Sequence, residues 1–315
     1  MILNLLLLVA GIALVIWGAD RFTDSASNVA RRWNVSELVI GLTIVALGTS
    51  LPEFVVSVIS SFQGSGDMSV GNIVGSNIFN TLVIIGTSAA VAPMIVSRGI
   101  LHRDIPMSIG ASILLFALCH DGKLDRWASI VLLMCFCLFM GYTYYIARHS
   151  KQSQDEATLA QQAPKGWGSI ALWLTVGIGC LVGGGQMLVG SATDIALRLG
   201  MSERIVGLTI LAAGTSLPEL ATSIVAARKG SAGLALGNAL GSNLFNIYFV
   251  LGVCSMINPM QISGISILDW ITLISGGILL LLVSLRNKIN RVGGILLTLG
   301  YLLYMSLLLI GQGNA

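Results

Sequence analysis

Residues 41–60 read GLTIVALGTSLPEFVVSVIS, and residues 207–227 read GLTILAAGTSLPELATSIVAA. The similarity continues into GNIVGSNIFN at residues 71–80 and GNALGSNLFN at residues 237–246. From the first glycine to the last asparagine, the two copies align without a gap at an offset of 166 and match at 21 of 40 positions. The chain therefore contains a duplicated unit.

The composition of the 315-residue chain excludes a soluble protein. It is 55% hydrophobic and only 10% charged, and its mean hydropathy is +0.88, whereas a soluble domain needs more polar surface to meet water. Apolar stretches close to the roughly 20 residues that a spanning helix needs recur along the whole length. We place ten spans near residues 2–33, 36–62, 69–92, 104–119, 126–147, 168–199, 202–227, 234–258, 265–285 and 292–311.

The duplication divides these spans into two groups of five. We expect a first five-helix repeat at 1–150 with its motif at 41–80, a polar cytoplasmic linker at 151–166, and a second five-helix repeat at 167–315 with its motif at 207–246. Because each half has an odd number of spans, the second half must enter the membrane from the opposite side. The expected fold is an all-α membrane protein of ten transmembrane helices in two inverted five-helix repeats, with broken helices at the centre.

The distribution of basic residues favours one orientation. With the N-terminus outside, twelve Lys and Arg residues fall on the cytoplasmic side and four fall outside, which fits the positive-inside rule. We therefore expect both termini to face out. The cytoplasmic set is Arg31, Arg32, Arg98, Arg103, Arg148, Lys151, Lys165, Arg228, Lys229, Arg286, Lys288 and Arg291, and the outer set is Lys123, Arg126, Arg198 and Arg204.

Two glutamates stand in the middle of apolar spans. Glu53 and Glu219 occupy equivalent positions of the two copies, and a charge at that depth costs on the order of 3 kcal/mol or more. Asp20 and Asp24 are expected in the outer-to-central part of the first helix. A purely structural role for the glutamates would require protonation or an arginine partner, and no Lys or Arg lies at a comparable depth. A bound cation is the better explanation.

A proline precedes each glutamate, and a proline inside a helix removes a backbone donor and displaces the preceding turn. Gly48 and Gly214 add flexibility at the same place, so both helices are expected to break there. Hydroxyl groups at the break come from Thr49, Ser50, Thr215 and Ser216. Carboxylate, hydroxyl and freed carbonyl oxygens are the hard ligands that Ca²⁺ and Na⁺ prefer. The sequence therefore predicts a cation site at the centre of the membrane.

The GNxxGSNxFN motif contributes a second set of polar residues. Its glycines have the GxxxG spacing that allows close helix contact. At 3.6 residues per turn, Ser76 and Asn80 share one helix face, as do Ser242 and Asn246, and we assign both pairs to the site. The remaining amides either line the site or bond helices to one another, and the sequence leaves both options open: Asn72, Asn77, Asn238 and Asn243.

The GTSLPE and GSNxFN motifs, present in each copy, resemble those of the cation/calcium exchanger superfamily, specifically the sodium/calcium exchanger branch with its prokaryotic members. The resemblance covers nearly the whole chain and implies four cation sites between the second, third, seventh and eighth helices. It implies that Glu53 and Glu219 bridge Ca²⁺. It also implies Na⁺ ligands at Ser50, Ser76, Ser216 and Ser242, and backbone or hydroxyl oxygen from Ala46, Thr49, Ala212 and Thr215.

The resemblance implies a secondary active antiporter that exchanges Na⁺ for Ca²⁺ by alternating access. This chain has Asn80 and Asn246, whereas some relatives carry an aspartate in the second repeat. The expected site therefore has two acids, which is more similar to potassium-independent exchange. Two carboxylates neutralise one Ca²⁺, whereas the three Na⁺ expected from the family leave one positive charge. Exchange should then be electrogenic. The first and sixth helices are expected to slide as gates.

Na⁺/Ca²⁺ exchange has three alternatives. A Ca²⁺(cation)/H⁺ antiporter on the same scaffold stays open, and a passive channel is disfavoured by inverted repeats with paired acids. An intramembrane enzyme is not expected, since no Ser/His pairing, histidine cluster or nucleotide-binding loop appears. We expect no cofactor; Ca²⁺ and Na⁺ are the transported ions. The expected partners are these ions and the lipid bilayer, with no nucleic acid, for a monomer in a prokaryotic plasma (inner) membrane.

Overall fold

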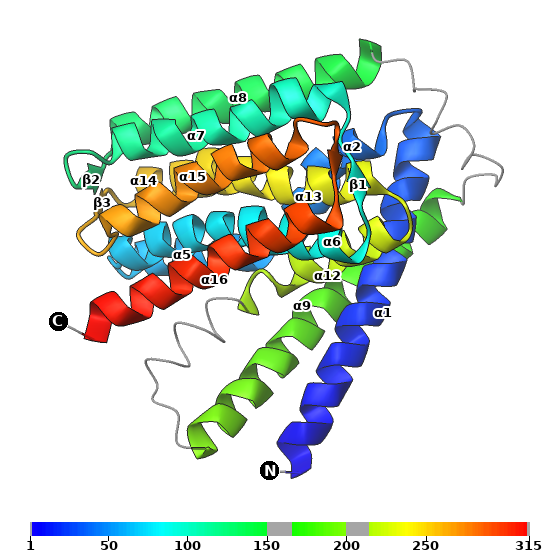
Figure 1. The fold of residues 1–315 in the computed structure, drawn as a ribbon, viewed down its shortest axis with the longest axis horizontal. Coiled ribbons are helices and arrows are strands. Elements are labelled where there is room, and N and C mark those ends of the chain that lie inside the picture. Colours follow the sequence, from blue (N-terminus) through cyan, green and yellow to red (C-terminus); the bar gives the residue numbers. More distant parts are fainter. Residues whose placement is uncertain (1, 150–165, 200–213, 314–315) are drawn as a thin grey trace.

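The computed structural model describes residues 2–149, 166–199 and 214–313, which are almost entirely helical (Figure 1). The predicted linker, up to residue 165, lies outside the described residues. So does the first part of the seventh predicted span, up to residue 213.

The elements of the first half follow one another with short connections. They are α1 (Ile2–Trp33), α2 (Glu37–Ile40), η1 (Gly41–Val45), α3 (Ala46–Thr49), α4 (Leu51–Phe62), α5 (Gly66–Phe79), η2 (Asn80–Ile84), α6 (Ile85–Val91), β1 (Met94–Ile95), η3 (Ile100–Asp104), α7 (Ile105–Leu118), β2 (Lys123–Leu124) and α8 (Arg126–His149).

The described elements of the second half follow the same order. They are α9 (Trp167–Arg198), α12 (Leu217–Arg228), α13 (Ala232–Leu244), η6 (Phe245–Val250), α14 (Leu251–Ile257), β3 (Met260–Gln261), α15 (Ile267–Ser284), β4 (Lys288–Ile289) and α16 (Arg291–Gly313).

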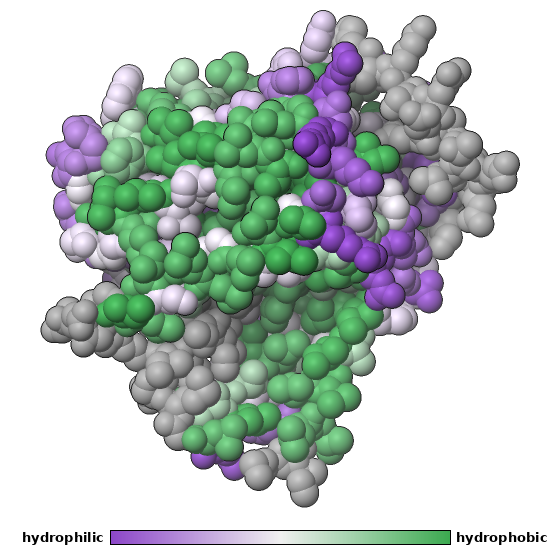
Figure 2. Space-filling view, in the orientation of Figure 1, coloured by the Kyte–Doolittle hydropathy of each residue, from purple (hydrophilic) through white to green (hydrophobic). Residues whose placement is uncertain are grey.

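Within the described residues, eight helices are long and apolar enough to cross a membrane. A ninth is present if the segments Glu37–Thr49 and Leu51–Phe62, bent by 50° at their junction, form one span. These nine coincide with nine of the predicted spans. The span expected near 202–227 is described only from Gly214 onward, where α12 forms its end. Exposed side chains on the face in Figure 2 are mostly apolar, as a lipid-facing surface requires.

Helices α1 and α9 form a pair that is inclined to the rest of the bundle (Figure 1). They run antiparallel, because Trp33 contacts Trp167 at one end and Asn4 donates to Asp194 at the other. Their backbones approach closely: a Cβ built on Gly11 would lie 2.8 Å from the carbonyl oxygen of Gly184. Such contact between small residues is typical of stable helix pairs in lipid.

Two short antiparallel sheets connect the halves of the chain. Strand β1 pairs with β4, with Met94 opposite Ile289, and β2 pairs with β3, with Leu124 opposite Met260. Each sheet therefore joins a loop of the first half to a loop of the second.

The GxxxG glycines of the second repeat allow α13 to lie directly on the η1–α3 segment. A Cβ built on Gly237 would lie 2.7 Å from the carbonyl oxygen of Leu38, and one built on Gly241 would lie 2.7 Å from Leu42 Cα and 2.8 Å from Ala46 Cβ. Side chains larger than hydrogen would separate the two motif-bearing helices. This contact brings the first GTSLPE break against the second GSNxFN motif.

The substitution Gly241→Ala should therefore destabilise the protein. The added methyl group meets backbone atoms, and overpacking of this kind costs about 1–3 kcal/mol in the free energy of unfolding. Thermal unfolding in detergent measures the change. Gly141→Ala on α8 is the matched control, because no described atom lies within 4 Å of the added carbon. Equal melting temperatures for the two variants would contradict the close contact.

Candidate cation-binding site

Each GTSLPE motif breaks its helix at the serine. Ser50 has φ −82° and ψ 9°, and Ser216 has φ −89° and ψ 9°, so the two breaks have nearly the same geometry. The following proline stands in the first turn of α4 or α12, where its missing N–H costs no hydrogen bond. The two glutamates consequently stand in the first turn of a helix, where the helix dipole favours negative charge.

The two glutamates are buried and are bonded across the repeats. Glu53 and Glu219 are 1% and 0% exposed. The hydroxyl of Ser216 donates to Glu53 Oε1 at 2.8 Å, and the hydroxyl of Ser50 donates to Glu219 Oε1, also at 2.8 Å. The two carboxyl groups are close enough to interact electrostatically. The serine of each repeat therefore hydrogen-bonds the glutamate of the other repeat.

Asparagines of the second motif hold the backbone of the breaks. Asn72 Nδ2 donates to the Glu53 carbonyl oxygen at 3.3 Å and to Ser57 Oγ at 2.9 Å. Asn238 makes the equivalent pair of bonds, to the Glu219 carbonyl at 3.2 Å and to Ser223 Oγ at 2.9 Å. These two asparagines thus connect helices, and Ser57 and Ser223 are partners that the sequence analysis missed.

The serine and asparagine pairs assigned to the site are all buried. Four buried carboxylate or carboxamide oxygens of the described residues have no hydrogen-bond partner there: Glu53 Oε2, Glu219 Oε2, Asn80 Oδ1 and Asn246 Oδ1. The hydroxyl oxygens of Ser76 and Ser242 are unpaired too. Unlike a hydroxyl, these four oxygens can only accept. They need a donor or a cation.

The other predicted ligands lie around the same break. Thr49 is buried and its hydroxyl donates to Asn238 Oδ1 at 3.0 Å. The hydroxyl oxygen of Thr215 is buried without a hydrogen-bond partner among the described residues. The carbonyl oxygen of Ala46 accepts from the Ser50 amide at 3.0 Å, and the Thr49 hydroxyl lies 3.5 Å from it. Ala212 lies outside the described residues.

The charges of this site have no protein counter-ion among the described residues. The ion pairs recorded there involve other acids, and no cluster of three or more His, Cys, Asp and Glu residues occurs there. The site consists instead of two carboxylates supplemented by hydroxyl and amide oxygens. Such oxygen-only sets suit hard cations, and a bound cation would supply the missing charge.

The helices that carry Asn80 and Asn246 change their hydrogen-bonding pattern at these residues. A π-helical turn, η2, begins at Asn80, and another, η6, begins at Phe245. π-Helical turns inside α-helices occur frequently at functional sites. Their appearance at equivalent places in both repeats adds to the case for this site.

Asp20 and Asp24 of α1 form ion pairs with a lysine of the second half. Lys229 Nζ lies 2.7 Å from Asp20 Oδ1 and 2.6 Å from Asp24 Oδ1. The neighbouring Ser231 donates to Glu37, so both aspartates lie toward the end of α1 that leads into α2. The sequence does not show which basic residue meets α1, so the pairing with Lys229 could not be predicted from it. The pairs connect α1 to the turn between α12 and α13.

Together, fold and site define a polytopic α-helical membrane protein of two repeats whose duplicated motifs converge on buried oxygen groups. The sequence model described as "Sodium/calcium exchanger protein" matches residues 3–145 and 169–310. The chain belongs to this family, which confirms the resemblance seen in its motifs.

Individual relatives agree with this assignment. The "Putative antiporter CaxA" of Alkalimonas amylolytica is 39% identical, over 98% of this chain and 99% of the relative. The "Inner membrane protein YrbG" of Escherichia coli (strain K12) is 36% identical, over 98% and 97%. A solved structure of the sodium-calcium exchanger NCX_Mj superimposes with a TM-score of 0.83 at 30% identity, covering 97% of this chain and 98% of that one. The two-repeat fold is therefore shared with that exchanger.

Calcium should stabilise the purified protein through the two glutamates. A ligand at 100 times its Kd adds about 2.7 kcal/mol to the free energy of unfolding. Glu53→Gln and Glu219→Gln should each abolish the Ca²⁺-induced rise in melting temperature, because a neutral carboxamide removes charge and replaces an acceptor by a donor. Thermal unfolding in detergent with and without Ca²⁺ measures this.

The matched control is Glu37→Gln. Glu37 begins α2 and accepts from Ser231 Oγ at 3.2 Å, outside the candidate site. It should retain the full Ca²⁺ response. A Ca²⁺ response that survives in Glu53→Gln and Glu219→Gln would move the cation site away from these residues.

Proposed function

We propose that this protein is a secondary active antiporter that exchanges Na⁺ for Ca²⁺ across a prokaryotic inner membrane. The observation that carries the proposal is the pair of buried glutamates, each bonded to the other repeat's serine, with four acceptor-only oxygens unpaired in the described residues. Two carboxylates balance one Ca²⁺, and the surrounding hydroxyl and amide oxygens supply further ligands. Ten spans, both termini outside, and a five-plus-five division at residues 151–166 complete the proposed topology.

Competition for the same carboxylates couples the two ions. Ca²⁺ and a set of Na⁺ ions cannot both occupy oxygens that belong to Glu53 and Glu219, so one must leave before the other binds. A site without cations would carry two uncompensated charges at mid-membrane, which is costly. The empty protein would therefore change slowly between the states open to the two sides of the membrane. Exchange of one Ca²⁺ for three Na⁺ would move one net charge per cycle.

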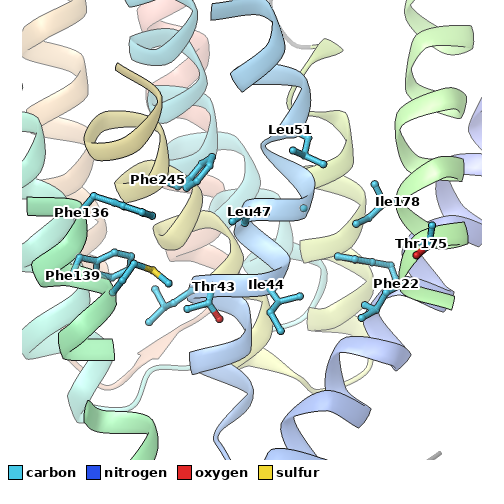
Figure 3. Close-up of a pocket in the computed structure, with 14 residues that line it drawn as sticks. Phe22, Thr43, Ile44, Leu47, Leu51, Phe136, Phe139, Thr175, Ile178 and Phe245 are labelled. Atoms are coloured by element: carbon cyan, nitrogen blue, oxygen red, sulfur yellow. The ribbon is translucent and has the colours of Figure 1, made fainter. Parts of the chain in front are cut away.

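Alternating access requires a part that moves against the site, and the α1–α9 pair is the proposed part. An apolar cavity of about 340 Å³ lies where the pair meets the η1–α3 segment, and residues of α8 also line it. Figure 3 shows Phe22 and Ile178 of the pair on one side of this cavity and Phe136 of α8 on the other. Thr43 and Thr175 also line the cavity, and their hydroxyls donate to carbonyl oxygens of their own helices. The apolar lining offers few directional contacts in the described residues, and sliding would have to break the ion pairs of Lys229 with Asp20 and Asp24.

A Ca²⁺(cation)/H⁺ antiporter is the second candidate. The observation in its favour is that Glu53 Oε2 and Glu219 Oε2 have no hydrogen-bond partner in the described part of the chain, so each could take a proton. Protons would then compete with Ca²⁺ in place of Na⁺. The coupling ion distinguishes the two functions.

Uptake of ⁴⁵Ca²⁺ into proteoliposomes tests the coupling ion. Vesicles loaded with Na⁺ should take up Ca²⁺, whereas vesicles loaded with K⁺ at equal pH should not, because only Na⁺ competes for the carboxylates. Each cycle would bring in two positive charges with Ca²⁺ and carry out three with Na⁺, so an inside-positive potential should speed Ca²⁺ uptake and an inside-negative potential should slow it. Glu53→Gln and Glu219→Gln should be inactive and Glu37→Gln active. Uptake driven by an acid interior without Na⁺ would establish the proton-coupled alternative instead.

Joining the α1–α9 pair to the bundle should stop transport. In a background without the five native cysteines, Asp24→Cys with Lys229→Cys places thiols where an ion pair now connects α1 to the α12–α13 turn. A short bifunctional thiol reagent should abolish ⁴⁵Ca²⁺ uptake, and cleavage of the reagent should restore it. The control is Trp17→Cys with Trp173→Cys, within the pair, where the rings lie 5.8 Å apart. Transport that continues with α1 joined to the bundle would exclude sliding.

A further inference from the structure

The site asparagines are oriented by two other asparagines. Asn246 Nδ2 donates to Asn77 Oδ1 at 3.1 Å, and Asn80 Nδ2 donates to Asn243 Oδ1 at 3.1 Å. All four side chains are at most 3% exposed. Each site asparagine therefore directs its nitrogen to the opposite repeat, and its oxygen has no hydrogen-bond partner among the described residues.

The direction of these bonds is determined by a backbone carbonyl. Asn77 Nδ2 donates to the carbonyl oxygen of Asn243 at 3.1 Å, and a carbonyl can only accept. The amide oxygen of Asn77 is consequently the atom that faces Asn246, and Asn246 must present its nitrogen there. On the other side, Asn243 Nδ2 is bonded to Thr81 Oγ1 at 2.9 Å. The second repeat has Ile247 at the position equivalent to Thr81, so the two sides are supported by different groups.

We propose that Asn77 and Asn243 are positioning residues: they select the face of the Asn246 and Asn80 carboxamides that meets the cation. The proposal rests on the proposed cation site. A carboxamide has an acceptor face and a donor face of nearly the same shape. With its oxygen toward the site it is a ligand, and with its NH₂ toward the site it repels a cation. Partners behind a metal ligand commonly change metal affinity about 10- to 100-fold.

This role predicts that the effect of Asn77→Leu on the Ca²⁺ Kd depends on the residue at position 246. Asn77→Leu should raise the Ca²⁺ Kd about 10- to 100-fold, because Asn246 loses the acceptor that orients it. In the Asn246→Asp background, Asn77→Leu should leave Kd unchanged or lower it. A carboxylate offers oxygen in either orientation, and removing Asn77 Oδ1 removes an acceptor that would face it. The charge that Asn246→Asp adds is present on both sides of that comparison and cancels.

The experiment is equilibrium ⁴⁵Ca²⁺ binding to the purified full chain in detergent, with thermal unfolding in Ca²⁺-free buffer for each variant. Asn258→Leu is the matched control: Asn258 Nδ2 also donates to a backbone carbonyl of another helix, that of Ser61 at 3.0 Å, outside the site. It should change the melting temperature without changing Kd. If Asn77→Leu does not fold, the mirror cycle of Asn243→Leu with Asn80→Asp carries the same test.

The outcomes separate the two proposals. A wild-type protein that binds no Ca²⁺ would overturn the proposed function. Wild-type binding, together with an equal fold loss from Asn77→Leu in the Asn246 and Asn246→Asp backgrounds, would overturn the positioning role alone, because a residue that only packs helices affects both backgrounds alike. A loss of Ca²⁺ affinity in the Asn246 background and none in the Asn246→Asp background would support the positioning role.

Discussion

The structure depends on the requirement that two carboxylates be held together in the apolar interior of a membrane. Isolation of such charges from water is expensive, and protein groups must replace the lost hydration. Here the replacement comes from the opposite repeat: the Ser50 hydroxyl donates to Glu219, and the Ser216 hydroxyl donates to Glu53. The remaining oxygens are left without protein donors in the described residues. In the proposed function, these oxygens meet the positive charge of the transported cations.

Other features of the core follow from this arrangement. The helix must break at Ser50 for its hydroxyl to reach across, and Asn72 and Asn238 bond the distorted backbone that results. Glycines of α13 allow the η1–α3 segment to approach within the distance at which these bonds form. Beyond the core, the α1–α9 pair and the two short sheets connect the halves. An apolar cavity lies where the pair meets the η1–α3 segment.

Much of this architecture was predictable because its signals are local. Glu53 and Glu219 interrupt apolar spans, and the i, i+4 spacing of Ser76 and Asn80 indicates a shared face. Nine expected spans coincide with helices of the described residues. The roles of Asn77 and Asn243 could not be deduced, since a polar side chain beside a site face can point inward or to a neighbouring helix, and only the packing decides. The strands of two residues have no periodicity to detect, and the partner of Asp20 and Asp24 lies about two hundred residues away along the chain.

The exchange of hydrogen bonds between the repeats also has a consequence for biogenesis and ancestry. As the chain is synthesised, the first half enters the membrane with Glu53 still lacking Ser216, so its carboxyl group must find another partner until the second half arrives. Neither half alone contains a complete site. With the repeats inverted as proposed, a chain with a single repeat would need a second copy inserted in the opposite direction to complete the site.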